Sequence, residues 1–483
     1  MRARYFLFLF LTLILWGSIA LATPANSSRV DTHQDDLIDY VHQVVTHSDD
    51  ALMLAEELTL SNFGVQQAQS QFRTVIRPIA DLAVDSTTRP RTGIEFSRQT
   101  PWGIDVSAGY ATDGFGSQGT QRSFAQVSIP VMARFGREVN ELPLTRAQIH
   151  QRKRSLDVKR QKQRLISKAI NQHIELILVE RIEHQSEHSV SRASKHVASA
   201  KARQRVGLVS KVDVHRAELR RLQQVEQLEH ARYVTQMQRE SYAELARLHH
   251  TNVSPPTKLP NITSVPSQRF LPEWRPEWHA HQLDEKLAHL ELSDARRRLL
   301  PDLNFQVKWL GTSYADQFEV LRRDGNDVYF SLRLQSDLDW RAKRRRINER
   351  EIALQRALRF GESLQRRLMR EVRSAEANLK TDKQRLHLAK LKQKEANRAL
   401  DVALARFERG IASNLDVIDA EQALSQAELA ALTAEAGTLM AVVDLALARG
   451  ELSLGWLDQA LGKGVSTQEI VPKNSTQEVA HAR

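Results

Sequence analysis

A motif of nineteen residues occurs twice in this chain, and the two copies lie 203 positions apart. The stretch AKARQRVGLVSKVDVHRAE at 200–218 aligns without a gap with ALARFERGIASNLDVIDAE at 403–421, and nine positions are identical. Long segments rich in Arg, Lys, Glu, Leu and Ala flank both copies. An internal repeat of this kind predicts a chain built from two equivalent halves, each with the same order of elements.

The repeated motif carries the signals of a short break between two helices. Each copy has a glycine, a serine three residues later and an aspartate three residues after that: Gly207, Ser210 and Asp213 in the first, and Gly410, Ser413 and Asp416 in the second. The glycines suit the left-handed residue that ends a helix. The serines suit the N-cap of the next helix, with the aspartates completing a capping box. Helices joined by so short a loop are antiparallel neighbours, so we predict two long helical hairpins.

Short segments in which apolar and polar residues alternate precede each long helical segment. They are IDVSAGY at 104–110, SFAQVSIPV at 123–131, LNFQVKW at 303–309 and DVYFSLRLQ at 327–335. Such alternation, bounded by turn residues, is typical of membrane β-barrel strands, although any half-buried sheet shows it too. The sequence therefore predicts two β-hairpins. Four strands are too few to close a barrel, so strands within a membrane would need further copies of the chain.

The start of the chain and its composition narrow the functional classes. Residues 1–22 combine Arg2 and Arg4 with an apolar run and end in Ala-Leu-Ala, which predicts a secretory signal peptide, with an uncleaved anchor as the alternative. No later segment is expected to be a transmembrane helix. The chain has no cysteine, which excludes disulfides, thiolate metal sites and cysteine catalysis. The net charge is +11, but the basic residues are interleaved with acidic residues and do not form a cluster. This pattern argues against a nucleic-acid partner.

These signals divide the chain into nine predicted segments. They are a signal peptide at 1–22, short helices at 23–93, a first β-hairpin at 94–135, a first long helical hairpin at 136–249, a linker at 250–276, a short helix at 277–299, a second β-hairpin at 300–336, a second long helical hairpin at 337–449 and a polar tail at 450–483.

The chain resembles the TolC-type outer membrane efflux protein family over nearly its whole length after residue 22. The resemblance rests on the two tips R-x-x-x-G-x-x-S-x-x-D-V at 203–214 and 406–417, and on LPDLN at 300–304. It implies a mainly α fold with a β-barrel portion, in which long antiparallel helical hairpins form an α-barrel. It also implies four strands per chain, a homotrimer and a twelve-stranded transmembrane β-barrel among the lipids of the outer membrane.

The resemblance further implies a passive exit duct of a tripartite efflux or type I secretion system, which extends from the outer membrane into the periplasm. Its partners would be a periplasmic adaptor protein and an inner-membrane transporter, with no enzyme activity and no cofactor or metal. No feature of the sequence indicates which substrate is exported.

The resemblance also assigns roles to residues at the tips. The gate or pore constriction would contain Asp213, Asp416, Asp419 and Phe407, and the adaptor-docking tips would contain Gly207, Leu208, Gly410 and Ile411. Simple helix capping is the alternative role for the first two aspartates, and an exposed helix charge is the alternative for the third. In the family a tyrosine and an arginine bond across the closed tip. The matching residues here, Phe407 and Ala412, cannot form those bonds, so Lys211 or Arg216 is the candidate for a substitute cation.

Two other classes remain open on the sequence alone. A soluble periplasmic coiled-coil adaptor or scaffold could also be built from the long hairpins. A zinc hydrolase is suggested by HQSEH at 184–188, which fits the H-x-x-E-H pattern of two metal-binding histidines. That motif lies within a charged helical face, where such spacing is common, so we do not expect it to bind metal.

Overall fold

The structure is a computed structural model of the chain. It describes residues 35–81, 91–113, 120–248, 259–260, 262, 270–314, 324–336 and 339–461. The predicted signal peptide at 1–22, most of the predicted linker at 250–276 and the tail after residue 461 lie outside the described residues.

The helices and strands follow one another in two similar series. The first series is α1 (Asp35–His47), α2 (Asp49–Ser70), β1 (Val75–Asp81), β2 (Arg91–Gln99), β3 (Asp105–Asp113), β4 (Thr120–Pro130), α3 (Arg137–Asn140), α4 (Leu142–Arg205) and α5 (Lys211–Leu245). The second is the 3-10 helix η3 (Pro272–Trp274), α6 (Pro276–Arg297), β5 (Asp302–Tyr314), β6 (Asp324–Gln335), α7 (Trp340–Glu408), α8 (Asn414–Arg449) and α9 (Leu454–Ala460).

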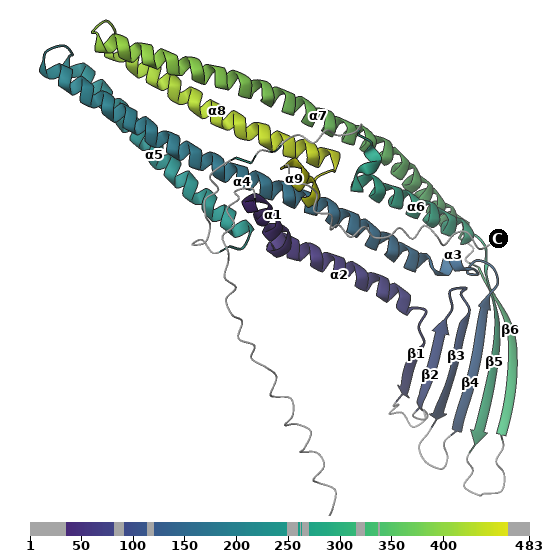
Figure 1. Cartoon of the computed structure of the whole chain (residues 1–483). Helices are drawn as coiled ribbons and strands as arrows, with labels where there is room; N and C mark the ends of the chain where they lie inside the picture. The colour runs from purple at the N-terminus through teal and green to yellow at the C-terminus, as the bar shows by residue number, and fades with distance from the viewer. Residues whose placement is uncertain are drawn as a thin grey trace, which may run out of the picture.

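The molecule is elongated, with its sheet at one end and two helical tips at the other (Figure 1). The hairpins α4–α5 and α7–α8 run alongside each other, and their turns lie at the end far from the sheet. α4 and α7 contain 64 and 69 residues, so each is roughly 100 Å long at about 1.5 Å per residue. The predicted pair of long helical hairpins is therefore present.

The sheet contains more strands than the sequence patterns predicted. Within the described residues, six strands form one antiparallel sheet in the order β1-β2-β3-β4-β5-β6, whereas four strands per chain were expected. The additional hairpin, β1 and β2, begins in the segment 23–93 that was assigned to short helices. β1 has only seven residues and contains Pro78, a residue that argues against an interior strand. The structure accommodates it because β1 is an edge strand.

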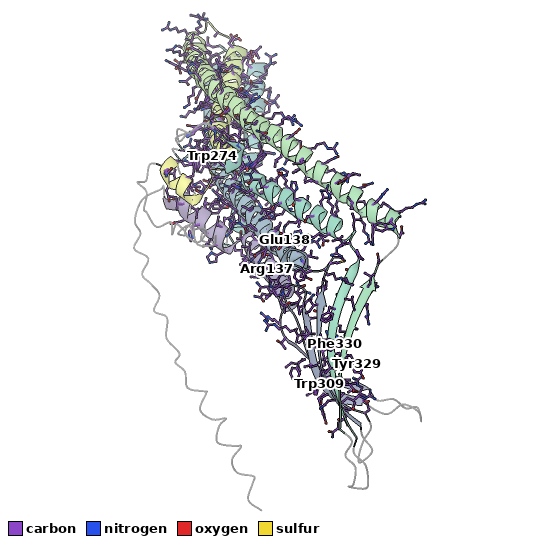
Figure 2. The ribbon with its side chains drawn as sticks, turned by 90° about the vertical axis from the view of Figure 1, so that its right-hand side faces the viewer. Arg137, Glu138, Trp274, Trp309, Tyr329 and Phe330 are labelled. Atoms are coloured by element: carbon purple, nitrogen blue, oxygen red, sulfur yellow. The ribbon has the colours of Figure 1, made fainter. Side chains whose placement is uncertain are left out.

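Strand pairing separates the two faces of this sheet by polarity. Facing residues share a face, and one continuous row of them is apolar in all six strands: Ile76, Phe96, Ala108, Ala125, Trp309 and Val328. The neighbouring row on the opposite face is polar in the last five strands: Ser97, Ser107, Gln126, Lys308 and Tyr329. Figure 2 shows Trp309, Tyr329 and Phe330 in this part of the molecule. The sheet thus has one apolar and one polar face.

The main hydrophobic core lies between the sheet and the tips, where α1 and α9 pack against the long helices. Tyr40 of α1 stacks on Tyr242 of α5, with ring centroids 3.8 Å apart. The hydroxyl of Tyr242 is 3.0 Å from Nδ1 of His173 in α4. Burial lowers the pKa of His173 to about 4, so its imidazole is neutral at neutral pH. These contacts join three helices from separate parts of the chain.

Two further expectations were wrong. The segment 450–483 was predicted to be a polar tail, but its start contains α9, whose Trp456 and Leu457 are buried in the core. In the described part of the chain, α8 is long and apolar enough by composition to cross a membrane, although no such helix was expected. Its apolar character comes largely from alanine and leucine, and only 33% of the apolar window is buried in the single chain.

A buried group of charges fixes the end of α8 to the other helices. Arg160 of α4 and Arg275, next to α6, are both almost fully buried. Arg160 donates to the carbonyl of Leu447 at 3.0 Å, and Arg275 donates to the carbonyl of Ala448. These carbonyls lie in the last turn of α8, where the helix dipole favours cations. Glu277 pairs with both guanidinium groups at 2.7 Å, and Glu371 of α7 approaches them at 3.7 and 3.3 Å.

The ionisation of Glu277 reflects these contacts. Burial by itself would raise the pKa of Glu277, but the hydrogen bond and charge of Arg275, together with the charge of Arg160, hold it below its usual value of 4.5. The carboxylate is therefore stabilised by the fold, and its contribution to stability is present at neutral pH. That contribution is lost as the pH falls below 4.5 and through the lower folded-state pKa.

We expect Glu277→Gln to lower the free energy of unfolding by about 3 kcal/mol at neutral pH, because it leaves two buried guanidinium groups with too little negative charge. Thermal unfolding of the variant should also depend less on pH below 4.5 than that of the unmodified protein. Glu362→Gln, which alters an exposed glutamate of α7, is the control and should change neither quantity. Equal losses in the two variants would contradict this account.

Candidate functional site: the hairpin tips

The two tips are tight turns that depend on glycine for their backbone conformation. Gly207 has φ of 81° and Gly410 has φ of 74°, in the left-handed region. A Cβ added at either glycine would meet no heavy atom within 4 Å. The requirement for glycine is therefore conformational, since L side chains avoid positive φ.

The serine and aspartate of each motif organise the helix that follows. Ser413 Oγ accepts from the backbone N–H of Asp416 at 3.2 Å, and the Asp416 carboxylate accepts from the N–H of Ser413 at 2.7 Å, which is a full capping box. Ser210 Oγ likewise accepts from the N–H of Asp213 at 3.2 Å, but the bond back to the Ser210 N–H is absent. The hydrogen bonds from Ser413 lower the pKa of Asp416, so it is ionised at neutral pH.

Apolar side chains are exposed at both turns. Leu208 and Ile411, which occupy equivalent positions in the repeat, are 74% and 73% exposed. Val206 and Val212 are exposed beside them in the first tip, and Leu415 is exposed in the second. Soluble surfaces seldom group so many large apolar residues, and such patches commonly mark contact sites for other proteins.

The three predicted gate aspartates differ in their surroundings. Asp416 and Asp419 are exposed on α8. Asp213 is partly covered and lies 3.8 Å from Arg216 of the same helix, while its hydroxyl partner Ser210 donates at 2.7 Å. Capping and surface exposure therefore coexist in Asp416, whereas Asp419 has surface exposure without a capping role.

Phe407 does not have the position that was predicted for it. Its side chain is only 4% exposed and packs with Leu400, Val417 and Leu424 between α7 and α8. The aromatic ring belongs to the core of the second hairpin and cannot line an open constriction. Phenylalanine has no hydroxyl to place beside a polar partner, so its ring gains most from burial.

The structure reveals a connection between the two tips that the sequence analysis missed. Arg203, near the end of α4, donates to the carbonyl of Phe407 and, at 3.0 Å, to that of Glu408. Its guanidinium carbon lies 4.4 Å from the centroid of the Phe407 ring. The carbonyls belong to the last turn of α7, so the cation also interacts favourably with the helix dipole. One side chain thus ties the first hairpin to the second.

A second contact between the hairpins is built around Asn414, which is buried at the start of α8. Its Nδ2 donates to the backbone carbonyl of Asp213 at 2.9 Å, and its Oδ1 lies 2.6 Å from Nε2 of His196. Lys211 and Arg216, the candidates for a substitute cation, do not make this connection; Arg216 pairs with Asp213 of its own helix. The repeat placed Arg203 and Arg406 in equivalent positions, but it gave no signal that only Arg203 crosses between hairpins.

A buried carboxylate lies one turn further from the tips. Burial raises the pKa of Glu421 in α8, although the charges of His196, Arg220 and Arg192 oppose that effect. Its equivalent in the repeat, Glu218, is instead paired with Arg221 at 2.7 Å on the helix surface. The two halves therefore share a sequence motif but differ in how they pack.

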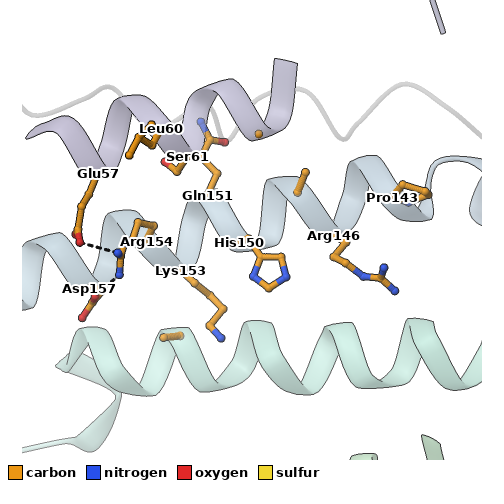
Figure 3. A pocket seen from close by; sticks show the side chains of 13 residues that line it. Glu57, Leu60, Ser61, Pro143, Arg146, His150, Gln151, Lys153, Arg154 and Asp157 are labelled. Atoms are coloured by element: carbon orange, nitrogen blue, oxygen red, sulfur yellow. Dashed lines mark hydrogen bonds and ion pairs between the residues drawn. The ribbon is translucent and has the colours of Figure 1, made fainter. Parts of the chain in front are cut away.

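Elsewhere in the described chain, two further candidates are a groove and the H-x-x-E-H motif. A groove of ≈ 810 Å³ lies between α2 and α4 (Figure 3), and its Arg154 is already paired with Glu57 at 2.6 Å and Asp157 at 3.1 Å. His184 of the H-x-x-E-H motif is 80% exposed, with Glu187 3.4 Å away. Among the described residues no three His, Cys, Asp or Glu side chains are grouped to hold a metal ion.

Comparison with known proteins agrees with this architecture. The family model described as outer membrane efflux protein matches residues 274–451. The solved structure of the outer membrane protein VceC from Vibrio cholerae is similar with a TM-score of 0.67 and 15% identity, over 86% of this chain and 96% of VceC. Residues 274–451 are therefore an outer membrane efflux protein domain. The residues before 274 form the other half of the internal repeat.

Two more outer membrane channels are similar in fold. The Campylobacter jejuni CmeC outer membrane channel gives a TM-score of 0.63 at 13% identity, over 91% of this chain and 92% of CmeC. The Neisseria gonorrhoeae MtrE outer membrane channel, solved in an open state, gives 0.65 at 14% identity, over 89% and 95%. No curated protein sequence matches the chain. The fold of this chain is thus that of outer membrane channels, and the matched domain is described as an outer membrane efflux protein.

We expect Arg203→Ala to loosen the contact between the hairpins, because hydrogen bonds to a charged group contribute about 1.5–3 kcal/mol each. The measurement is hydrogen exchange of the backbone amides of residues 410–412, which bond to carbonyls of the last turn of α7. Exchange there should become about tenfold faster. Arg205→Ala, which removes an exposed arginine two residues away, is the matched control. An unchanged exchange rate in Arg203→Ala would refute the proposed connection.

Proposed function

We propose that three copies of this chain form a passive exit duct in the outer membrane, with the sheets in the lipid and the helical hairpins extending through the periplasm. The observation that carries this proposal is the division of one sheet into an apolar and a polar face at one end of a molecule whose helices are roughly 100 Å long. A water-filled barrel has polar residues inside and apolar residues toward lipid.

The need for several copies follows from the edges of the sheet. Among the described strands, none pairs with the outer edge of β1 or β6. In hydrocarbon each unpaired backbone group costs several kcal/mol, so these edges require partners that neighbouring copies can supply. The helices can gain from the same assembly, because about two thirds of the apolar window of α8 is not fully buried in one chain. Packing of α8 against neighbouring copies would cover this surface in a helical barrel.

The tips are proposed as the periplasmic gate and as the docking site for an adaptor that connects the duct to an inner-membrane transporter. Support for docking comes from Leu208 and Ile411, which are exposed at turns that no other described element covers. Support for gating comes from Arg203 and Asn414, which hold the two hairpins together close to the exposed Asp416 and Asp419. Separating the hairpins would require these contacts to break.

The lipid-facing side of the sheet can be tested with two adjacent residues of β6. Phe330 faces Val307 on the apolar face, and Ser331 faces Gln306 on the polar face. We expect Phe330→Arg to destabilise membrane assembly by about 2–4 kcal/mol, since arginine would meet hydrocarbon. Ser331→Arg should assemble normally because it would face water. Assembly is measured as the heat-resistant oligomer in outer membrane extracts, and equal loss in both variants would refute the assignment of the faces.

The charge of the gate can be tested by ion selectivity in planar bilayers. The double variant Asp416→Asn and Asp419→Asn should lower the cation-to-anion permeability ratio about two- to fivefold, because aspartate rings near the axis favour cations. Ser413 remains the N-cap and still accepts from the backbone N–H of residue 416, so the turn should persist. Asp39→Asn in α1, which removes one negative charge outside the tips, is the control. A ratio unchanged by the double variant would place these aspartates away from the ion path.

The proposal as a whole is tested by extracting the protein from outer membranes with detergent, then measuring native mass and single-channel conductance. We expect a trimer that conducts. A soluble monomer released by osmotic shock and without conductance would refute the exit duct.

A further inference from the structure

The hairpin formed by β1 and β2 has no counterpart in the second half of the chain. The helices after the tips, α5 and α8, begin at Lys211 and Asn414, 203 positions apart. α2 and α6 each contain 22 residues, but they begin at Asp49 and Pro276, 227 positions apart. The difference between 227 and 203 means that the first half contains 24 more residues between these helices and the tips. This excess is close to the length of the β1–β2 hairpin, which occupies residues 75–99.

The additional hairpin has the same polarity as the rest of the sheet. On the apolar face, Ile76 and Phe96 face each other, and Phe96 also faces Ala108 of β3. On the opposite face, Ser97 faces Ser107, and Gln99 faces Asp105. Ile76, Ile94 and Phe96 are exposed large apolar residues in the single chain. A soluble hairpin would gain nothing from this exposure, whereas a membrane strand requires it.

Pairing also places β2 firmly within the sheet. All nine residues of β2 have partners in β3, from Arg91 with Asp113 to Gln99 with Asp105. β3 therefore has neighbours on both sides and cannot be the edge that meets another copy. The edge of the sheet on this side is β1.

We propose that each copy contributes six strands to the transmembrane barrel, and that the barrel closes where β1 of one copy pairs with β6 of the next. This inference rests on the proposed trimer. Three copies then give eighteen strands in place of the twelve that the family resemblance implies. Barrel diameter grows roughly in proportion to strand number, so the pore through the outer membrane would be about 1.5-fold wider. Barrels of 16–18 strands enclose an aqueous channel.

The geometry of the chain fits this closure. Consecutive strands are antiparallel throughout the sheet, so the first and sixth strands run in opposite directions. A junction between β1 and the next copy's β6 is then antiparallel like every other pair. Two charged residues of the additional hairpin, Arg77 and Glu95, face each other on the side opposite to Ile76 and Phe96. The wider pore would therefore gain a charged pair in its wall.

Cysteine cross-linking can test the closure, because the chain has no cysteine of its own. Ile76→Cys in β1 is combined in turn with Phe330→Cys, Leu332→Cys and Leu334→Cys in β6, all on the apolar face. The control set combines Val106→Cys of β3, on the same face, with the same three positions. After oxidation in outer membranes, we expect covalent dimers and trimers from at least one β1 pair and from none of the β3 pairs.

A second variant tests the register within one chain. Phe96→Cys with Ala108→Cys should form a disulfide inside each monomer, since these residues face each other in β2 and β3. Native mass of every variant is measured alongside. A trimer that cross-links through β3 and β6, or that lacks the β2–β3 disulfide, would refute the eighteen-stranded barrel but leave the exit duct intact. A monomer without cross-links would refute the proposed function itself.

Discussion

The structure depends on one constraint: backbone N–H and C=O groups at the edges of a sheet must be paired when water is excluded. One chain provides an apolar sheet face, which suits hydrocarbon, and two open sheet edges, β1 and β6. In hydrocarbon the unpaired backbone groups of those edges would cost several kcal/mol each. Closure by sister copies satisfies both edges. The same proposed assembly would complete the burial of the apolar residues of α8, which are only partly buried in one chain.

The helical part is stabilised by a few long-range polar contacts in addition to its core. In the middle of the molecule, Arg160 and Arg275 bind the final carbonyls of α8 and share Glu277. At the tips, Arg203 binds the final carbonyls of α7. Both arrangements place a cation at the carboxyl end of a long helix, where the unpaired carbonyls and the dipole favour it. The first arrangement is buried, whereas the second is partly exposed at the tips.

The repeat explains both the symmetry and the differences of the molecule. The two tips share glycine, serine and aspartate because the same turn is needed twice. Their surroundings differ because Phe407 is buried and receives Arg203, while Gln204, its equivalent in the repeat, is only partly buried. The halves differ again in the sheet, where the first contains an additional hairpin. If the proposed gate lies at the tips, the proposed wider barrel would leave the main resistance to flow there.

The sequence alone determined the elements that depend on local chemistry. Positive φ at Gly207 and Gly410, the caps at Ser210 and Ser413, the long hairpins and the strands β3 to β6 follow from spacing and alternation, which act over a few residues. The offset of 227 between α2 and α6 emerges only from where these helices begin in the structure. β1 is short and contains Pro78, so its alternation gave no clear signal in the sequence. Only the tertiary structure decided that β1 and β2 join the sheet, that Phe407 is buried and that Arg203 crosses between hairpins. Those outcomes depend on contacts between residues far apart in the chain, where packing and backbone pairing outweigh local preference.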